Sequence, residues 1–298
     1  FANGREPRRI SSYSVLAANY RWGTGDVSFS LLATYIKDFL QTGAPSPFRR
    51  FSPSVSFSFA PFAALPLRLR ASFKDSFRVP TFADLYYLRL GNVGLKPEKA
   101  MQYNVGVAWA DSLNSVFKSV SLSADVYYNN VRDKIVALPT MYIWRMMNFG
   151  RVDIWGVDAC ADIACSLSSR MSLVANLGYS FMYAIDITDS AAKNYRHQLP
   201  YTPRHSGSFS LSFENPVVNV SYLLSAVGDR YMLPQNTERN IMPGYIEHGF
   251  SFNRNFDIRK VALRLQCELL NVTNSQYEVI KNYPMPGFSW RLSARVGF

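Results

Sequence analysis

The last eleven residues, Phe288–Phe298, read F-S-W-R-L-S-A-R-V-G-F and alternate between apolar and polar positions. Serine, arginine and glycine separate the apolar residues. A period of two predicts a β-strand with one apolar face and one polar face. A soluble β-sandwich would also contain such a strand, so the fold depends on whether the chain repeats the pattern at membrane-spanning length.

The pattern recurs along the whole chain. Thirteen segments carry the two-residue period, near 13–22, 26–37, 51–60, 65–77, 100–110, 117–131, 150–165, 170–183, 203–213, 216–227, 245–256, 260–272 and 287–298. Most have about 10 to 15 residues, whereas soluble strands have about five or six and tilted transmembrane strands need roughly 9–11. The lengths therefore favour an all-β fold, a transmembrane antiparallel β-barrel.

The connections between these segments alternate in length without a break. The short ones lie near 23–25, 61–64, 111–116, 166–169, 214–215 and 257–259, and the long ones near 38–50, 78–99, 132–149, 184–202, 228–244 and 273–286. Short periplasmic turns and long outer loops are typical of outer-membrane barrels. The alternation predicts that the C-terminus lies in the periplasm.

Aromatic residues agree with this orientation, because they cluster at the turn ends of the strands, where a periplasmic girdle would lie. These residues are Tyr20, Trp22, Phe59, Trp109, Phe213, Phe256 and Phe298.

Thirteen is an odd number, whereas bacterial single-chain barrels have an even number of strands. By the alternation, the first strand runs from the outside inward. An open sheet edge in lipid would leave backbone groups without hydrogen-bond partners. We therefore expect further strands before Phe1, and an unpaired edge at residues 287–298 unless another segment supplies a partner.

Composition excludes several classes of protein. The chain is 48% hydrophobic, yet no window approaches the roughly 18 apolar residues of a transmembrane helix. The net charge is +11, but no basic run is longer than a pair such as Arg8-Arg9 or Arg49-Arg50. This spread suits a polar pore lining or contact with anionic lipid, and we expect no nucleic-acid partner. Three cysteines without zinc-ligand spacing predict neither a metal site nor a cofactor.

The loop over residues 77–100 reads F-R-V-P-T-F-A-D-L-Y-Y-L-R-L-G-N-V-G-L-K-P-E-K-A. It resembles the C-terminal part of TonB-dependent outer-membrane receptors of the cobalamin and ferric-siderophore type, which carry an F-R-x-P box followed by a G-N-x-x-L-x-P-E box. The family motif falls on Phe77, Arg78, Pro80, Asn92, Leu95, Pro97 and Glu98. Further matches lie at 125–131, 200–205 and 268–274, so the resemblance spans essentially the whole chain.

The resemblance implies a barrel of 22 strands around an N-terminal plug. Residues 1–298 would then be the C-terminal part of the barrel, with its last thirteen strands and without the plug. The implied location is the outer membrane of a Gram-negative bacterium. The implied partners are the TonB complex (through the absent plug segment), outer-membrane lipid, the barrel-assembly machinery reading Phe298, a small-molecule nutrient and a surface lipoprotein.

The implied function is import of a scarce, large nutrient. The ending Y-P-M-P-G at Tyr283–Gly287 favours cobalamin, with a ferric siderophore or haem as alternatives. Haem receptors of this family often carry a histidine between the two boxes, and none stands between Pro80 and Asn92. A passive porin-type channel of about fourteen strands, which needs no plug, remains a separate alternative.

Aromatic and cationic residues in the long loops are the candidate ligand contacts, because they offer large contact area and directed donors. They are Tyr86, Tyr87, Arg89, Tyr142, Trp144, Arg145, Met146, Tyr195, Arg196, Tyr231 and Arg239. Packing within the loops is the alternative for each. Arg78 either ties the base of its loop to Asp84 or Glu98, or contacts the ligand. No G-x-S-x-G context supports a catalytic nucleophile, so we expect no enzyme.

Overall fold

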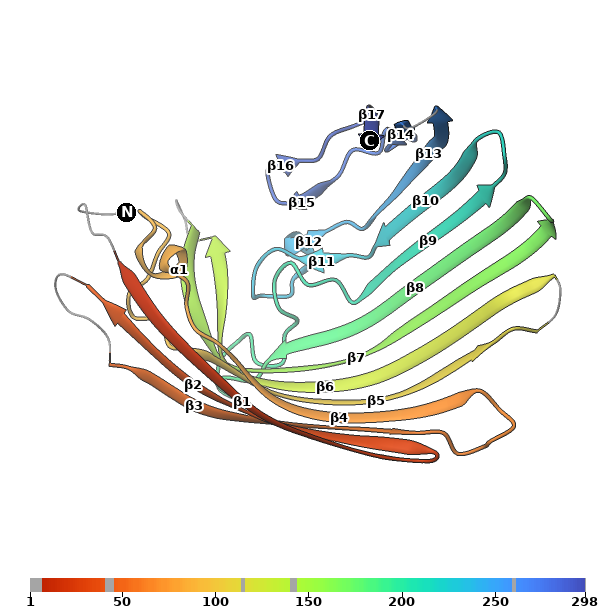
Figure 1. Ribbon diagram of the computed structural model, residues 1–298. Helices are drawn as coiled ribbons and strands as arrows, with labels where there is room; N and C mark the ends of the chain where they lie inside the picture. Colours follow the sequence, from red (N-terminus) through yellow and green to blue (C-terminus); the bar gives the residue numbers. More distant parts are fainter. Residues whose placement is uncertain (1–6, 41–45, 114–115, 140–143, 259–260, 298) are drawn as a thin grey trace. The chain divides into compact units, whose positions relative to one another are not determined.

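The computed structural model describes residues 7–40, 46–113, 116–139, 144–258 and 261–297. Its main element is an antiparallel sheet of thirteen strands, each placed beside the next one in chain order (Figure 1). These strands are β1 (Arg8–Trp22), β2 (Gly25–Phe39), β3 (Phe48–Phe59), β4 (Leu67–Arg78), β5 (Glu98–Asp111), β6 (Phe117–Pro139), β7 (Trp144–Ser168), β8 (Met171–Asp186), β9 (His205–Glu214), β10 (Asn219–Val227), β13 (Tyr245–Ile258), β14 (Val261–Leu270) and β17 (Ser289–Gly297).

All thirteen predicted strands are therefore present and in order, and the all-β fold class is confirmed. The strand order ends at β1 on one side and at β17 on the other, so within the described ranges each of these has one neighbour in the sheet. This is the free edge expected at the last strand. No helix among the described residues is long and apolar enough to cross a membrane.

The sheet has two faces of opposite character, as β1 to β3 show. On one face, Asn19 donates a hydrogen bond to Ser28 (2.6 Å) and the hydroxyls of Ser30 and Ser54 lie 2.8 Å apart. The other face carries large apolar side chains such as Phe51, which is 70% exposed. We call these the polar face and the apolar face. An uncovered apolar face is the surface that a lipid-facing strand needs.

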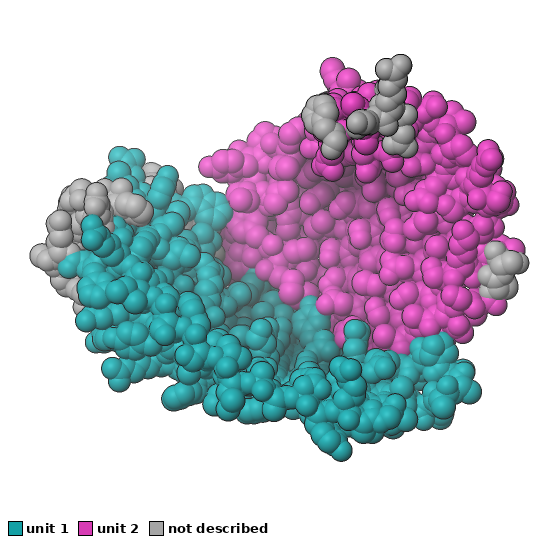
Figure 2. Space-filling model, in the orientation of Figure 1, with its two compact units in different colours: residues 1–106, 126–155, 183–199 teal, residues 107–125, 156–182, 200–298 magenta. Residues whose placement is uncertain are grey.

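The chain divides into two compact units, which Figure 2 shows in teal and magenta. Unit 1 comprises residues 1–106, 126–155 and 183–199, and unit 2 comprises residues 107–125, 156–182 and 200–298. Each unit contains long loops, which lie at the ends of the strands that we call the loop ends. The short connections define the turn ends.

The predicted open loop at 132–149 is wrong over most of its length. β6 continues to Pro139 and β7 begins at Trp144. Ile135 and Met146, which these two strands carry, are only 4% and 8% exposed and belong to one apolar cluster. Because that cluster holds both strand ends, the strands extend beyond the predicted boundaries.

The other long connections contain short elements that alternation does not predict. Within 79–97 lies helix α1 (Phe82–Tyr86); within 228–244 lie β11 (Arg230–Tyr231), the 3-10 helix η2 (Glu238–Asn240) and β12 (Ile241–Met242); within 271–288 lie β15 (Glu278–Ile280) and β16 (Tyr283–Pro284). β11 pairs with β12 and β15 with β16. These loops therefore contain regular secondary structure, which fixes the positions of their side chains.

The predicted aromatic residues gather at the turn ends. The rings of Tyr20 and Trp22 are 6.1 Å apart and stacked, and Trp22 lies 6.0 Å from Phe57. Phe57 in turn stacks on Phe59 at 6.2 Å. Phe298 lies outside the described residues.

Candidate functional site

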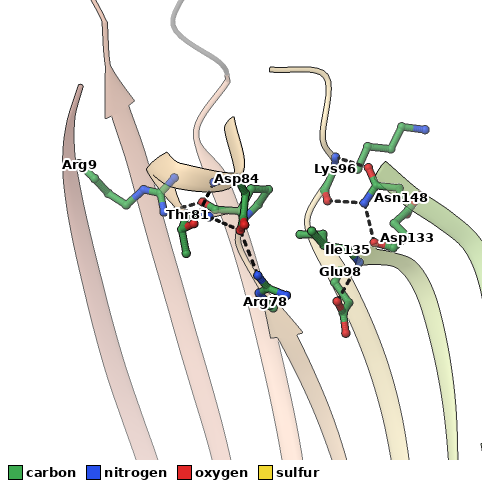
Figure 3. A network of polar contacts seen from close by, with 10 residues as sticks. Arg9, Arg78, Thr81, Asp84, Lys96, Glu98, Asp133, Ile135 and Asn148 are labelled. Carbon is green, nitrogen blue, oxygen red and sulfur yellow. Dashed lines mark hydrogen bonds and ion pairs between the residues drawn. The ribbon is translucent and has the colours of Figure 1, made fainter. Parts of the chain in front are cut away.

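The first site is the loop at 79–97 of unit 1. A helix cap and an ion pair hold the base of this loop. Thr81 caps α1: the Asp84 amide donates to the Thr81 hydroxyl (3.1 Å), and the Thr81 amide donates to the Asp84 carboxylate (2.9 Å). Arg78 donates to the same carboxylate at 3.0 Å. Figure 3 shows these three side chains pointing toward one another. Of the two acids expected to pair with Arg78, the structure selects Asp84.

Arg9 fastens this loop to the sheet from β1. Its guanidinium makes two parallel bonds to Asp38 (2.6 and 2.8 Å) and donates to the Pro80 carbonyl (3.0 Å). It also lies over the Phe82 ring, 4.9 Å from its centroid. Bidentate carboxylate pairs of this kind are strong and directional. They also explain why β1 and β2 pair beyond the predicted ends, from Arg8 onward.

The far side of the same loop is fastened to the hairpin of β6 and β7. The amide of Asn92 donates to the Met146 carbonyl (3.1 Å), and the Ile135 amide donates to the Glu98 carboxylate (3.0 Å). Beneath these bonds, Leu95 is 8% exposed and packs in the apolar cluster. Asn148 accepts from the Lys96 amide at 2.9 Å; Figure 3 shows this bond and the one to Glu98.

The seven motif residues thus have described positions. Arg78, Pro80, Asn92 and Glu98 make the polar ties given above, Leu95 is buried, and the Phe77 ring lies 5.1 Å from that of Phe48. Pro97 lines a cavity of about 500 Å³, together with Arg9, Asp38, Pro80, Leu85 and Tyr86. The motif builds the wall of a cavity whose remaining lining is largely apolar.

The second site lies in unit 2, where the loops at 228–244 and 271–288 meet. Arg230 is 4% exposed and its guanidinium donates to the carbonyls of Glu278 and Pro243. Arg230 also lies 5.5 Å from the centroid of the Tyr245 ring, and that ring stacks on Tyr277 at 3.9 Å. One buried cation therefore joins both loops.

The Tyr277 hydroxyl donates a hydrogen bond to the Glu247 carboxylate. Burial raises the pKa of the Tyr277 phenol well above its ordinary value, and the bond to Glu247 and its charge raise it further. Burial also raises the pKa of Tyr201. Both phenols are therefore neutral hydrogen-bonding groups at physiological pH.

A cavity of about 410 Å³ lies between these two loops. Its lining combines the cations Arg239 and Lys281 and the acid Glu278 with Met232, Met242 and Tyr277. Lys281 lies 3.3 Å from Glu278, whereas the structure pairs Arg239 with no acid among the described residues. A pocket with cationic, thioether and aromatic groups can hold a bulky anionic molecule.

The other predicted ligand contacts are dispersed. In unit 1, Tyr86 ends α1, Tyr87 and Arg89 follow it, Tyr195 and Arg196 lie in the loop after β8, and Trp144, Arg145 and Met146 lie in β7; in unit 2, Tyr231 lies in β11 and Arg239 in η2. Trp144, Arg145 and Met146 are thus strand residues rather than loop residues, because the hairpin continues to its tip. Tyr142 lies outside the described residues.

Of the candidates that the structure describes, Tyr86 and Arg239 alone line the two cavities. Sequence reasoning missed Arg9, Asp38, Met232, Met242 and Lys281, whose side chains line them as well. Arg9 and Asp38 lie in strands, and no spacing in the sequence relates them to the loop at 79–97. Lys281 and the two methionines were within predicted loops and could have been included by residue type.

The family match at 268–274 covers the end of β14 and the start of the last loop, where Asn271 makes the key contacts. Asn271 is 2% exposed, with a left-handed backbone (φ 48°). Its amide donates to the carbonyls of Ser275 (2.9 Å) and Pro286 (3.1 Å). Asn271 therefore closes the base of the last loop. Among the described residues, no group of His, Cys, Asp and Glu is arranged to hold a metal ion.

A long-stranded antiparallel sheet with an uncovered apolar face and long loops at one end is typical of outer-membrane β-barrel proteins. The family described as TonB dependent receptor-like, beta-barrel, matches residues 3–274. The chain belongs to this family. Its members are receptors of the Gram-negative outer membrane and not enzymes, as predicted.

Solved structures share the fold at low sequence identity. The ferric citrate transporter FecA in the unliganded form aligns with a TM-score of 0.72 and 12% identity, over 98% of this chain and 46% of FecA. The siderophore receptor PiuA from Acinetobacter baumannii gives 0.70 and 15%, over 98% and 43%. The copper transporter OprC gives 0.66 and 17%, over 96% and 47%. The chain spans less than half the length of these proteins.

Proposed function

We propose that this chain is the C-terminal part of the barrel of a TonB-dependent import receptor that takes up a scarce, bulky nutrient across the outer membrane. Family membership is the observation that carries the proposal. The partial coverage of the solved structures supports the view that further strands and a plug complete the receptor. Transport would draw energy from the TonB complex through that plug.

The two cavities support a receptor over a passive channel. Arg9, Asp38 and the capping box hold one long loop in place, and Arg230 holds two others. Loops fixed in this way pre-organise a binding surface and lower the entropic cost of binding. A wide diffusion channel has no use for such a surface.

The ligand class follows from charge. The cavity with Arg239 suits an anionic ferric chelate, because a carboxylate or catecholate group would meet this cation, whereas Lys281 is paired with Glu278. Cobalamin, favoured by the sequence, has no contact of its own in support, so a ferric siderophore is at least as good a candidate. FecA is described as a ferric citrate transporter and PiuA as a siderophore receptor, which agrees with this choice.

Binding to the intact receptor tests the proposal. We expect a ferric siderophore or ferric citrate to bind, and Arg239→Gln with Lys281→Gln to weaken binding about tenfold, since the lost charge-assisted bond to Arg239 costs about 1 kcal/mol or more. Arg170→Gln, which removes an exposed turn cation of the same unit that does not line this cavity, is the matched control. Preference for cyanocobalamin, unaffected by the double variant, would reverse the ligand assignment.

Uptake measurements separate import from diffusion. We expect accumulation of the ligand in cells to require TonB and to saturate with ligand concentration. Linear, TonB-independent uptake would instead support the porin-type channel. Contact with the barrel-assembly machinery through Phe298 and with a surface lipoprotein remain predictions that deletion of Phe298 and affinity capture can test.

A further inference from the structure

Three adjacent pairs of residues at the loop ends of β1, β2 and β3 divide their charges between the two faces of the sheet. They are Arg8-Arg9, Lys37-Asp38 and Arg49-Arg50. Neighbouring residues on a strand point to opposite faces. Arg9 pairs with Asp38, and Arg50 pairs with Asp75 at 2.6 Å. The polar-face members are therefore neutralised in ion pairs.

Arg8, Lys37 and Arg49 belong to the other face. The register aligns Arg8 with Phe39 and Arg49 with Tyr35, so all three share the apolar face with these rings. All three are exposed, and none has an acidic partner within the part of the chain that the structure describes. Within the described ranges, three cations thus lie on an apolar surface without an acidic partner.

The three cations form a compact group. Arg8 and Lys37 are diagonal neighbours across β1 and β2, and Lys37 and Arg49 are diagonal neighbours across β2 and β3. Diagonal neighbours on one sheet face are about 7–8 Å apart. The Lys37 ammonium lies over the Phe39 ring (5.0 Å) and the Arg49 guanidinium over the Tyr35 ring (5.4 Å). The rings support the cations at the edge of the apolar surface.

The distance of the three cations from the turn ends matches the position of the lipid headgroup layer on the opposite side of the membrane. Arg49 and the girdle residue Phe59 are roughly ten residues apart on β3, or about 33 Å along the strand. A strand tilted by roughly 35–45° converts this length into about 23–27 Å across the membrane, close to the apolar band of about 25 Å in such barrels. The cations therefore lie just beyond the hydrocarbon, on the side of the long loops.

We propose that Arg8, Lys37 and Arg49 form a binding site for a phosphate-bearing lipid of the outer leaflet, with its phosphates on the cations and its acyl chains along the apolar face. Three cations within about 16 Å suit a headgroup with more than one phosphate. Phe51, 70% exposed below Arg49 on the same face, offers contact to the chains. The inference rests on the outer-membrane placement proposed above.

The test uses the intact receptor in a neutral, phosphate-free detergent, titrated with fluorescent bisphosphorylated lipid A. We expect the combined Arg8→Gln, Lys37→Gln and Arg49→Gln variant to bind about a hundredfold more weakly, because each cation near an anionic lipid surface contributes about 1 kcal/mol. The matched control is Arg254→Gln. Arg254 also lies on the apolar face over a ring, that of Phe256 (4.7 Å), but near the turn end of β13.

The outcomes are distinct. Unchanged binding by the triple variant, equal loss in the Arg254 control, or equal affinity for dephosphorylated lipid A would overturn the proposal. Displacement by inorganic phosphate at concentrations as low as those of lipid A would indicate a soluble-phosphate site and would also overturn it. If the triple variant does not fold, as gel mobility before and after heating reveals, Lys37→Gln alone should weaken binding about fivefold.

Membrane fractionation of cells is run first on the wild-type protein. A receptor found outside the outer membrane would refute the proposed function, whereas an outer-membrane receptor without lipid A affinity would refute only the lipid site.

Discussion

At the scale of single residues, position along a strand decides the role of each charge. Arg9 and Arg8 are adjacent and chemically identical. Arg9 points to the polar face, where Asp38 neutralises it and the Pro80 carbonyl accepts a further bond. Arg8 points to the apolar face, where no described acid meets it. Arg9 therefore holds a loop, and Arg8 is available to a partner outside the chain.

We predict that Asp38→Asn destabilises the protein by about 1–3 kcal/mol, because Arg9 would lose its only described carboxylate partner while remaining largely covered. The Asp38 side chain is 6% exposed and that of Arg9 20%. Denaturant unfolding of the intact protein measures the change. Asp26→Asn is the control, since the Asp26–Arg68 pair is long (3.6 Å) and half exposed and should contribute less than about 0.5 kcal/mol. Equal losses in both variants would contradict the assignment.

At the scale of elements, the loop at 79–97 depends on a tight turn after α1. Its motif glycine, Gly91, donates its amide to the Tyr87 carbonyl at 2.8 Å. A Cβ at this position would lie 2.7 Å from the Tyr87 amide nitrogen and 2.8 Å from the Leu85 carbonyl. Both are backbone atoms, which cannot move without disturbing the helix. The close approach of these backbone atoms therefore explains why the motif carries a glycine at this position.

We predict that Gly91→Ala loosens this loop and costs about 1–3 kcal/mol of local stability through overpacking. Limited proteolysis should then cleave residues 79–97 faster than in the wild-type protein. Gly94→Ala, in the same loop, is the control, because its Cβ would meet only the Asn92 side chain, at 3.3 Å. Cleavage of the two variants at the wild-type rate would show that the turn tolerates a side chain.

At the scale of the whole molecule, the sheet formed by the described residues presents two strand edges, at β1 and at β17. Edge strands display unpaired amides and carbonyls, and lipid offers these groups no hydrogen-bond partners. The edges are compatible with a membrane only if other strands cover them. The two edges therefore support the proposal of a larger barrel independently of the family motif.

We predict that residues 1–298 expressed alone (33.8 kDa) form no stable monomer in detergent, because both edges would remain open. Size-exclusion chromatography should show aggregates or mixed oligomers. Gel mobility should not change on heating, whereas the intact receptor should show the shift of a folded barrel. A well-behaved monomer of this chain that forms open channels would favour the porin-type alternative.

Local patterns predicted the thirteen strands, their order and their two faces, because the two-residue period and the turn residues are signals within short stretches of sequence. The sequence also located the family motif. The prediction of a loop at 132–149 was wrong, because Ile135 and Met146 are buried against the loop at 79–97, and this burial is a long-range effect. Only the tertiary structure brought Arg9 to Asp38 and Pro80, or aligned Arg8, Lys37 and Arg49 on one face. Strand register and loop packing set these contacts between residues far apart in the chain, and no local pattern encodes them.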